Sequence, residues 1–378
     1  MKVQLRPDPF SSKIEAKTPY LTKLSQRSIV ELLRIMDDIQ SLKEVIQSSN
    51  INFLIGAGLS TPFLPTLNSI ETRLVAEKDA EKRIEIYKEY FEKVMLPNCA
   101  VADGTISKAA NSDFKETYES YQEFFNLIAH ILLGRKSTIL SKQANIFTTN
   151  IDILMETALE EANLEYNDGF TGQLSPTFSL SNFKKTISKR SLHFENISEI
   201  PTFNIIKMHG SLTWVKGKGD NIVFSKLGHI NKSLLKKTGA DFTSEYQKIL
   251  IVNPEKKKFQ ETVMDVNYYE LLRMYSSELE KENTVLFVMG CSMADEHIQQ
   301  ITVRSANSNP TLKIYIFCHS NKGVEEMKKN MSYETLKYSN ISIIGPVDDA
   351  AENSYNLHKI NDSVFKNILL KKNETQHD

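Results

Sequence analysis

With 378 residues and nearly balanced charge, 46 basic against 47 acidic side chains, the chain can bury a large core, and we expect no direct binding of nucleic acid. Its three cysteines, Cys99, Cys291 and Cys318, form no CxxC pair, which argues against a disulfide framework or a four-thiolate zinc site. The apolar stretches at 124–134 and 285–293 fall short of the ~20 residues of a membrane span, and no signal peptide is evident, so we expect a cytoplasmic protein.

The predicted elements begin with a polar arm and a helix at 25–48, where apolar residues recur at helical spacing. An apolar run from Asn52 follows and stops at glycines, as a buried parallel strand does. We then predict one long helix at about 70–95, a loop at 97–112 and a second helix at about 114–133.

Short β-like runs recur through the rest of the chain, most of them separated by enough residues for a crossover helix. They lie at 145–149, 203–208, 248–252, 284–289, 312–318 and 341–344. This alternation predicts an α/β fold with a Rossmann-like, doubly wound parallel sheet. We expect an arm and helix at 1–48, the main domain at 49–350 with a helical insertion at about 70–140, and a C-terminal helix and tail at 351–378.

Two of the runs end in glycine loops that suit a nucleotide. Gly56-Ala57-Gly58-Leu59-Ser60 permits a tight turn and close approach of the backbone to a pyrophosphate. A plain turn is the alternative, and the third glycine of the usual dinucleotide fingerprint is absent, which argues against an ordinary dehydrogenase. Gly290-Cys291-Ser292 leads through Asp295 into a capped helix, and it fits either the adenosine half of a dinucleotide or a simple strand-to-helix junction.

Two other runs end in polar side chains that suit catalysis. In Thr148-Thr149-Asn150-Ile151-Asp152 the amide and the carboxylate can face one pocket, and the alternative is a cap for a helix at 153–162. His209 of Lys207-Met208-His209-Gly210-Ser211 can serve as a base near pH 7, and the alternative is a structural histidine. Because the carboxyl ends of parallel strands meet at one edge of a sheet, we expect these loops to converge on one crevice.

In this order the four motifs resemble those of the sirtuin family of NAD-consuming enzymes, over about 52–318. The resemblance implies that NAD binds in the crevice as a substrate. It implies that Asn150 orients the ribose and the attacking water, and that His209 is the general base. The residues that it implies for cofactor binding are Gly56, Ala57, Gly58, Ser60, Thr148, Asp152, Gly290, Ser292 and Asp295.

The sequence departs from that of sirtuin deacetylases in several places. Residues 61–66 stand where they have a Pro-Asp-Phe-Arg segment, and Thr149 replaces a Gln. No cysteine lies between Ser211 and Met289, so the zinc module of deacetylases is missing and we expect no zinc. The motif at 292–298 is more similar to the sirtuin-like domains of bacterial antiphage defence.

These features together predict an NAD glycohydrolase (NADase), because water is the natural nucleophile when the acyl-lysine groove is lost. Two alternatives stay open: a zinc-less NAD-dependent protein deacylase, and a non-catalytic module that binds NAD or ADP-ribose in an assembly. The resemblance also implies a defence partner that restrains the activity, for instance a HerA-type ATPase. The helix at 25–48 is a candidate element for a homo-oligomer, with packing against the core as the alternative.

Overall fold

The computed structural model describes residues 42–66, 68–137, 139–190, 196–252, 263–347 and 354–370. The chain divides into two units, 1–44 and 45–378, and the elements below belong to the second. The predicted arm, most of the helix at 25–48 and the tail from 371 lie outside the described residues. No helix within the described ranges is long and apolar enough to cross a membrane.

A parallel sheet organises the second unit and confirms the predicted fold class. Seven strands of the described chain pair in the order β13-β12-β11-β1-β2-β8-β3, and every pairing is parallel. Their bounds are β1 Asn50–Ile55, β2 Gln143–Thr148, β3 Glu165–Asn167, β8 Thr202–Lys207, β11 Thr284–Met289, β12 Lys313–Phe317 and β13 Ile341–Ile344. β8 and β11 are buried at every position, and β11 accordingly appears in the sequence as a nearly continuous apolar run, whereas β8 also buries polar residues.

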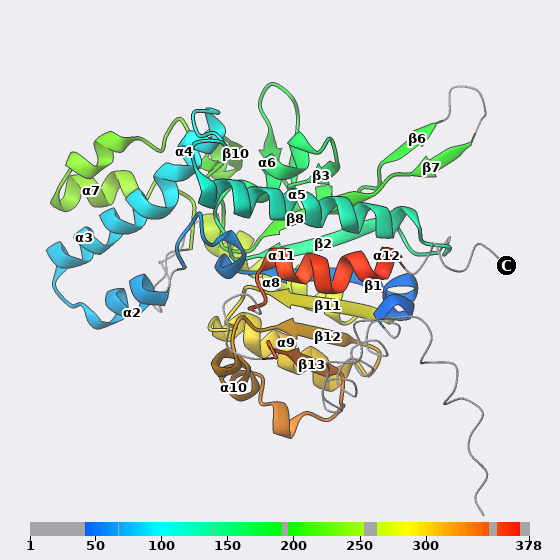
Figure 1. The fold of residues 1–378 in the computed structure, drawn as a ribbon. Helices are drawn as coiled ribbons and strands as arrows, with labels where there is room; N and C mark the ends of the chain where they lie inside the picture. Colours follow the sequence, from blue (N-terminus) through cyan, green and yellow to red (C-terminus); the bar gives the residue numbers. More distant parts are fainter. Residues whose placement is uncertain are drawn as a thin grey trace, which may run out of the picture. The chain divides into compact units, whose positions relative to one another are not determined.

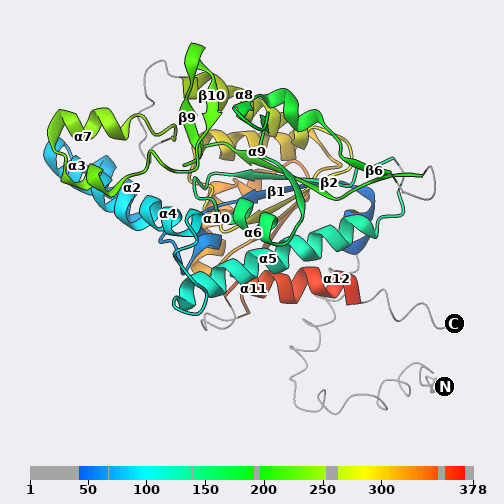
Figure 2. The same ribbon diagram turned by 90° about the horizontal axis from the view of Figure 1, so that it is seen from above.

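Helices cover both faces of this sheet (Figures 1 and 2). On one face α5 contacts α6, α11 and α12, and on the other α8 packs against α9. Their bounds are α5 Ser112–Leu133, α6 Leu154–Glu161, α8 Val263–Leu279, α9 Glu296–Ser308, α10 Asn321–Asn330, α11 Leu357–Ile360 and α12 Lys366–Leu370. The order of the strands reverses between β1 and β11, which is where an open parallel sheet binds its ligands.

A row of asparagines crosses the middle of the sheet. Asn52, Asn145 and Asn204 lie opposite one another on β1, β2 and β8. Asn145 Nδ2 donates to Asn52 Oδ1 at 2.9 Å, and Asn204 Nδ2 donates to Asn145 Oδ1 at 2.8 Å. Asn145 Nδ2 also lies 3.2 Å from Glu278 Oε2 of α8. Each neighbouring pair of these amides therefore shares one hydrogen bond across the sheet, and Oδ1 of Asn204 has no hydrogen-bond partner among the described residues.

The helical insertion differs from its prediction. The single helix expected at 70–95 is three pieces, α2 Asn68–Ala76, α3 Ala80–Tyr90 and a π turn at Phe91–Met95, because Asp79 caps a new helix by accepting from the amides of two following residues. The loop expected at 97–112 begins as helix α4, Leu96–Ala102. The π turn shifts the hydrogen bonding to Leu96 N–H···O Phe91, which allows the helix to continue through Pro97.

Smaller elements lie beside the main sheet. One antiparallel sheet has the order β4-β5-β10-β9, and β6 with β7 forms a hairpin. The bounds are β4 Phe170–Thr171, β5 Thr177–Phe178, β6 Ser188–Arg190, β7 Ile197–Glu199, β9 Trp214–Lys216 and β10 Ile222–Phe224. Helix α7, Gly239–Tyr246, lies beside α3 (Figure 1), with the rings of Tyr87 and Tyr246 5.1 Å apart.

The prediction of a strand at 248–252 is wrong. In this segment only Ile251 pairs, through an isolated antiparallel bridge to Gly210. Val252 N–H donates to the carbonyl of His209 at 2.8 Å, so the segment fixes the turn that follows β8. Gly210 has a φ of +78° there, and a Cβ would collide with the carbonyl of Leu250.

Candidate functional site

A cavity of about 540 Å³ opens at the carboxyl ends of the strands, a volume typical of small-molecule sites. It brings together the predicted site residues Gly56, Ala57, Gly58, Ser60, Asn150, Asp152, His209, Gly290, Ser292 and Asp295. Thr148 does not line it. Its hydroxyl donates to the carbonyl of Ile55 at 2.8 Å and accepts from the amide of Asn150 at 3.0 Å, so it fixes the loop after β2.

The glycine loops after β1 and β11 touch each other. Gly58 N–H donates to the carbonyl of Gly290 at 2.9 Å. A Cβ on Gly56 would lie 2.5 Å from that same carbonyl oxygen and 2.7 Å from Cα of Cys291. Gly290 itself has a φ of +60°, in the left-handed region. These glycines are therefore required for the contact between two loops, whereas the sequence suggested a tight turn and a close approach to a ligand.

Four buried polar side chains form a network at the floor of the cavity. Asn150 Nδ2 donates to Ser60 Oγ at 3.1 Å, and Ser60 Oγ donates to Asp152 Oδ2 at 3.0 Å. Tyr121 OH of α5 lies 3.3 Å from Ser60 Oγ. Asn150 Oδ1 is buried without a hydrogen-bond partner in the described structure, which leaves an acceptor for a ligand hydroxyl.

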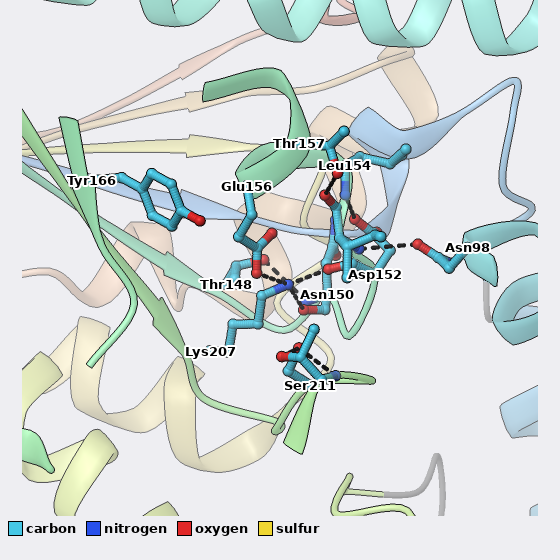
Figure 3. Close-up of polar contacts among 12 residues, drawn as sticks. Asn98, Thr148, Asn150, Asp152, Leu154, Glu156, Thr157, Tyr166, Lys207 and Ser211 are labelled. Carbon is cyan, nitrogen blue, oxygen red and sulfur yellow. Dashed lines mark hydrogen bonds and ion pairs between the residues drawn. The ribbon is translucent and has the colours of Figure 1, made fainter. Parts of the chain in front are cut away.

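Asp152 has two roles at once. Its Oδ2 accepts from Ser60 in the network above, and its Oδ1 accepts from the amide of Leu154 at 3.1 Å, at the start of α6 (Figure 3). The side chain therefore lines the cavity and also binds a backbone amide at the start of α6, but the N-cap residue of that helix is Ile153 and not the Asn or Asp of the alternative interpretation.

His209 is held by a carboxylate. Its Nε2 lies 3.1 Å from Asp295 Oδ2, and the two side chains are 18% and 23% exposed. Asp295 Oδ1 accepts from the amides of His297 and Ile298 and so caps α9. Burial opposes the ionisation of Asp295, but the hydrogen bond and charge of His209 and the two amides outweigh it and lower its pKa to about 2.

The ionised carboxylate determines which nitrogen of His209 carries the proton. In neutral imidazole one nitrogen donates and the other accepts. Because Asp295 can only accept, Nε2 is the donor and Nδ1 is left with the lone pair. Asp295 was predicted to bind cofactor; it lines the cavity, and it also binds His209 and caps α9.

Some cavity residues were missed by the sequence analysis. Tyr90 and Val94 reach the cavity from the helical insertion, and no motif marks them. Burial and the nearby charge of Asp152 raise the pKa of Tyr90 well above its usual range. His319 and Ser320 also line the cavity, directly after β12. The rule that ligands lie beyond strand ends would have found these two.

Comparison with known proteins identifies one family. The sequence profile of the SIR2-like domain matches residues 144–344. No curated protein matches the chain.

Solved structures with a similar arrangement include a Sir2 homologue in complex with NAD, with 14% identity, 88% of this chain and 94% of that chain covered, and a TM-score of 0.41. A second comes from work on the structural basis for the mechanism and regulation of Sir2 enzymes. It has 13% identity, with 89% of this chain and 99% of that chain covered, and a TM-score of 0.42. A third is a mutant Sir2 homologue in complex with 2'-O-acetyl ADP ribose, at 15% identity, with 90% and 99% covered and a TM-score of 0.40.

Proposed function

Since this chain belongs to the SIR2-like domain family, a membership that indicates the binding and processing of NAD, we propose that it hydrolyses NAD to nicotinamide and ADP-ribose. One observation carries the proposal. Asn150 and His209 follow different strands, 59 positions apart in the chain, and both line the same cavity. A module that only bound the nucleotide would not need a base beside this amide.

The residues of the cavity fit NAD. The unpaired Oδ1 of Asn150 can accept from a ribose hydroxyl, and the glycine loop after β1 lines the cavity at the switch point of the sheet, where its small residues let a nucleotide approach the backbone. The buried carboxylate of Asp152 suits the carboxamide of nicotinamide, to which it can offer an acceptor.

Hydrolysis of NAD needs few groups beyond these side chains. The bond between C1' of the ribose and the ring nitrogen breaks, and its electron pair leaves with neutral nicotinamide. Water adds its oxygen to C1' and loses one proton, so NAD and water give nicotinamide, ADP-ribose and H⁺. In this proposal Asn150 holds the ribose and the water, and Nδ1 of His209 accepts the proton.

The helical insertion favours water over an acyl-lysine as the nucleophile. Tyr90 and Val94 of the insertion line the cavity, so the protein's own side chains form the wall on this side of the cavity. A wall of this kind leaves less room for a peptide substrate, and it supports hydrolysis over deacylation.

The wider role that we propose is NAD depletion in antiphage defence, in the cytoplasm, by a homo-oligomer under the control of a partner such as a HerA-type ATPase. We also propose that the domain boundaries lie at 48/49 and 350/351. Because a free NADase would exhaust the NAD of its own cell, a partner that restrains the activity fits this role.

The test is the identity of the products. Purified chain is incubated with NAD and no peptide, and nicotinamide, ADP-ribose and cyclic products are separated by mass. We expect equal amounts of nicotinamide and ADP-ribose, and a loss of roughly 10²-fold or more in His209→Ala and Asn150→Ala. His130→Ala and Asn126→Ala, on the exposed surface of α5, are the matched controls.

The same variants are expressed in bacterial cells, with and without phage infection, and cellular NAD is measured. Wild-type chain that binds NAD but releases no nicotinamide under either condition would overturn the proposal. Release that depends on an added acyl-lysine peptide would replace it with deacylation.

A further inference from the structure

A buried cation lies directly behind the loop that follows β2. Lys207, the last residue of β8, is 3% exposed, and its Nζ lies 3.0 Å from Oε1 of Glu156 on α6, which is 13% exposed. Lysine is almost never buried to this degree unless it is paired, and removing an ammonium from water is costly. Such a group calls for a reason beyond the packing of the strand.

The other contacts of this ammonium are two backbone carbonyls (Figure 3). Lys207 Nζ donates to the carbonyl of Asp152 and lies 3.5 Å from the carbonyl of Asn150. These are two of the four residues whose side chains form the polar network at the floor of the cavity. Neither Lys207 nor Glu156 lines the cavity, so they contact the loop from its far side.

The loop needs such support because it lies between regular elements. β2 ends at Thr148 and α6 begins at Leu154, so the carbonyls of residues 150 and 152 belong to no strand ladder or helix. The carbonyl of Ile151 between them accepts from the amide of Leu212 at 3.0 Å. Three successive carbonyls are therefore bound by groups at the end of β8 or just after it, and two of them meet the same ammonium.

Glu156 explains how the ammonium stays in place. Burial raises the pKa of Glu156, and the charge of Lys207 opposes that rise. Its Oε2 is buried with no hydrogen-bond partner in the described ranges, so Lys207 is the charged partner that compensates this carboxylate.

We propose that Lys207, held by Glu156, is a positioning residue that fixes the backbone of residues 150–152 so that the side chains of Asn150 and Asp152 face the ligand. The proposal rests on the proposed function only in taking a nucleotide that contains ADP-ribose as the ligand.

The test separates this role from a purely structural one. Lys207→Met, Glu156→Gln and the double variant Lys207→Met/Glu156→Met are compared by their urea midpoints, their affinity for ADP-ribose and their kcat and KM for NAD. Lys108→Met is the matched control, because Lys108 pairs with Glu161 of the same helix but lies on the surface.

We expect Lys207→Met to lose about tenfold or more in affinity for ADP-ribose, the effect of one hydrogen bond to a charged group, and to lose kcat as well. Glu156→Gln, which leaves Lys207 its two carbonyls, should lose less. The double variant removes the buried charges together, so its urea midpoint should recover relative to Lys207→Met while its affinity stays low. If Lys207→Met does not fold, the affinity of the double variant still tests the proposal.

A double variant that regains affinity together with stability would overturn the proposal, as would equal losses of affinity in Lys207→Met and Glu156→Gln. Wild-type chain that binds ADP-ribose but releases no nicotinamide would overturn only the proposed hydrolysis, because the comparison of affinities does not depend on turnover.

Discussion

Asp295→Asn tests the pairing of His209 with Asp295, because asparagine keeps the shape of the side chain and can still cap α9. The folded pKa of Asp295 is about 2, against an ordinary value of 3.8. This difference corresponds to about 2 kcal/mol of stabilisation by the ionised carboxylate at neutral pH. Part of it comes from the cap, which asparagine retains, so we expect the free energy of unfolding to fall by about 1–2 kcal/mol at pH 7.

The stabilisation by the carboxylate of Asp295 should decrease as the pH falls. Because the folded pKa lies below the unfolded one, the carboxylate stabilises the fold fully above the unfolded value and stops doing so as the pH falls through about 2. The difference in the free energy of unfolding between wild type and Asp295→Asn should therefore stay constant from pH 7 to about pH 5 and shrink to about half by pH 3. Urea unfolding at these pH values measures it. Asp79→Asn, at the exposed cap of α3, is the control.

The same variant decides between two roles for Asp295 in turnover. The amide of asparagine can donate to Nε2 of His209, which would move the ring proton to Nδ1 and remove the base. We expect kcat for nicotinamide release to fall roughly 10²-fold or more with little change in affinity for ADP-ribose. A variant that loses affinity but keeps kcat, or a stability gap of equal size at pH 3 and pH 7, would refute this reasoning.

Three further changes test other parts of the structure. Gly56→Ala places a Cβ 2.5 Å from the carbonyl of Gly290, so it should lower both the melting temperature and NAD affinity, whereas Gly228→Ala, which meets nothing within 4 Å, should change neither. Asn145→Leu removes the donor to Oδ1 of Asn52 and the shortest hydrogen bond of Nδ2 of Asn204, and it should cost about 2–4 kcal/mol of stability by urea unfolding; NAD affinity should be kept. Tyr90→Ala opens the cavity beside the insertion, so methanol should compete better with water and the ratio of methyl ADP-ribose to ADP-ribose should rise; an unchanged ratio would place Tyr90 away from the reacting carbon.

The main sheet could be predicted because its strands carry a strong signal. β11 is buried at every position and appears as an apolar run that stops at Gly290, and β8 is equally buried and carries the apolar pair Ile205 and Ile206 near its end. Parallel pairing then brings the ends of these runs to one edge, which is why Asn150 and His209 could be expected to line the same cavity.

Other features could not be predicted, for reasons of scale and distance. Strands of two or three residues, such as β4 and β5, are too short for the alternation that marks a strand. The partner of His209 lies 86 positions away and was assigned to the ligand instead, because sequence alone does not show which polar groups meet. Tyr90 sits at the end of a helix whose break at Asp79 was overlooked, although an aspartate ahead of Glu81 is a recognisable cap.

The asparagine row across β1, β2 and β8 also controls how these strands align. Its amides meet only in the observed register, since a slip by one residue would turn them to the opposite face. Such a slip would also shift the end of a strand by about 3 Å along its axis. The same three strands lead into Gly56, Asn150 and His209, so the row keeps the loops of the cavity level with one another while the sheet assembles.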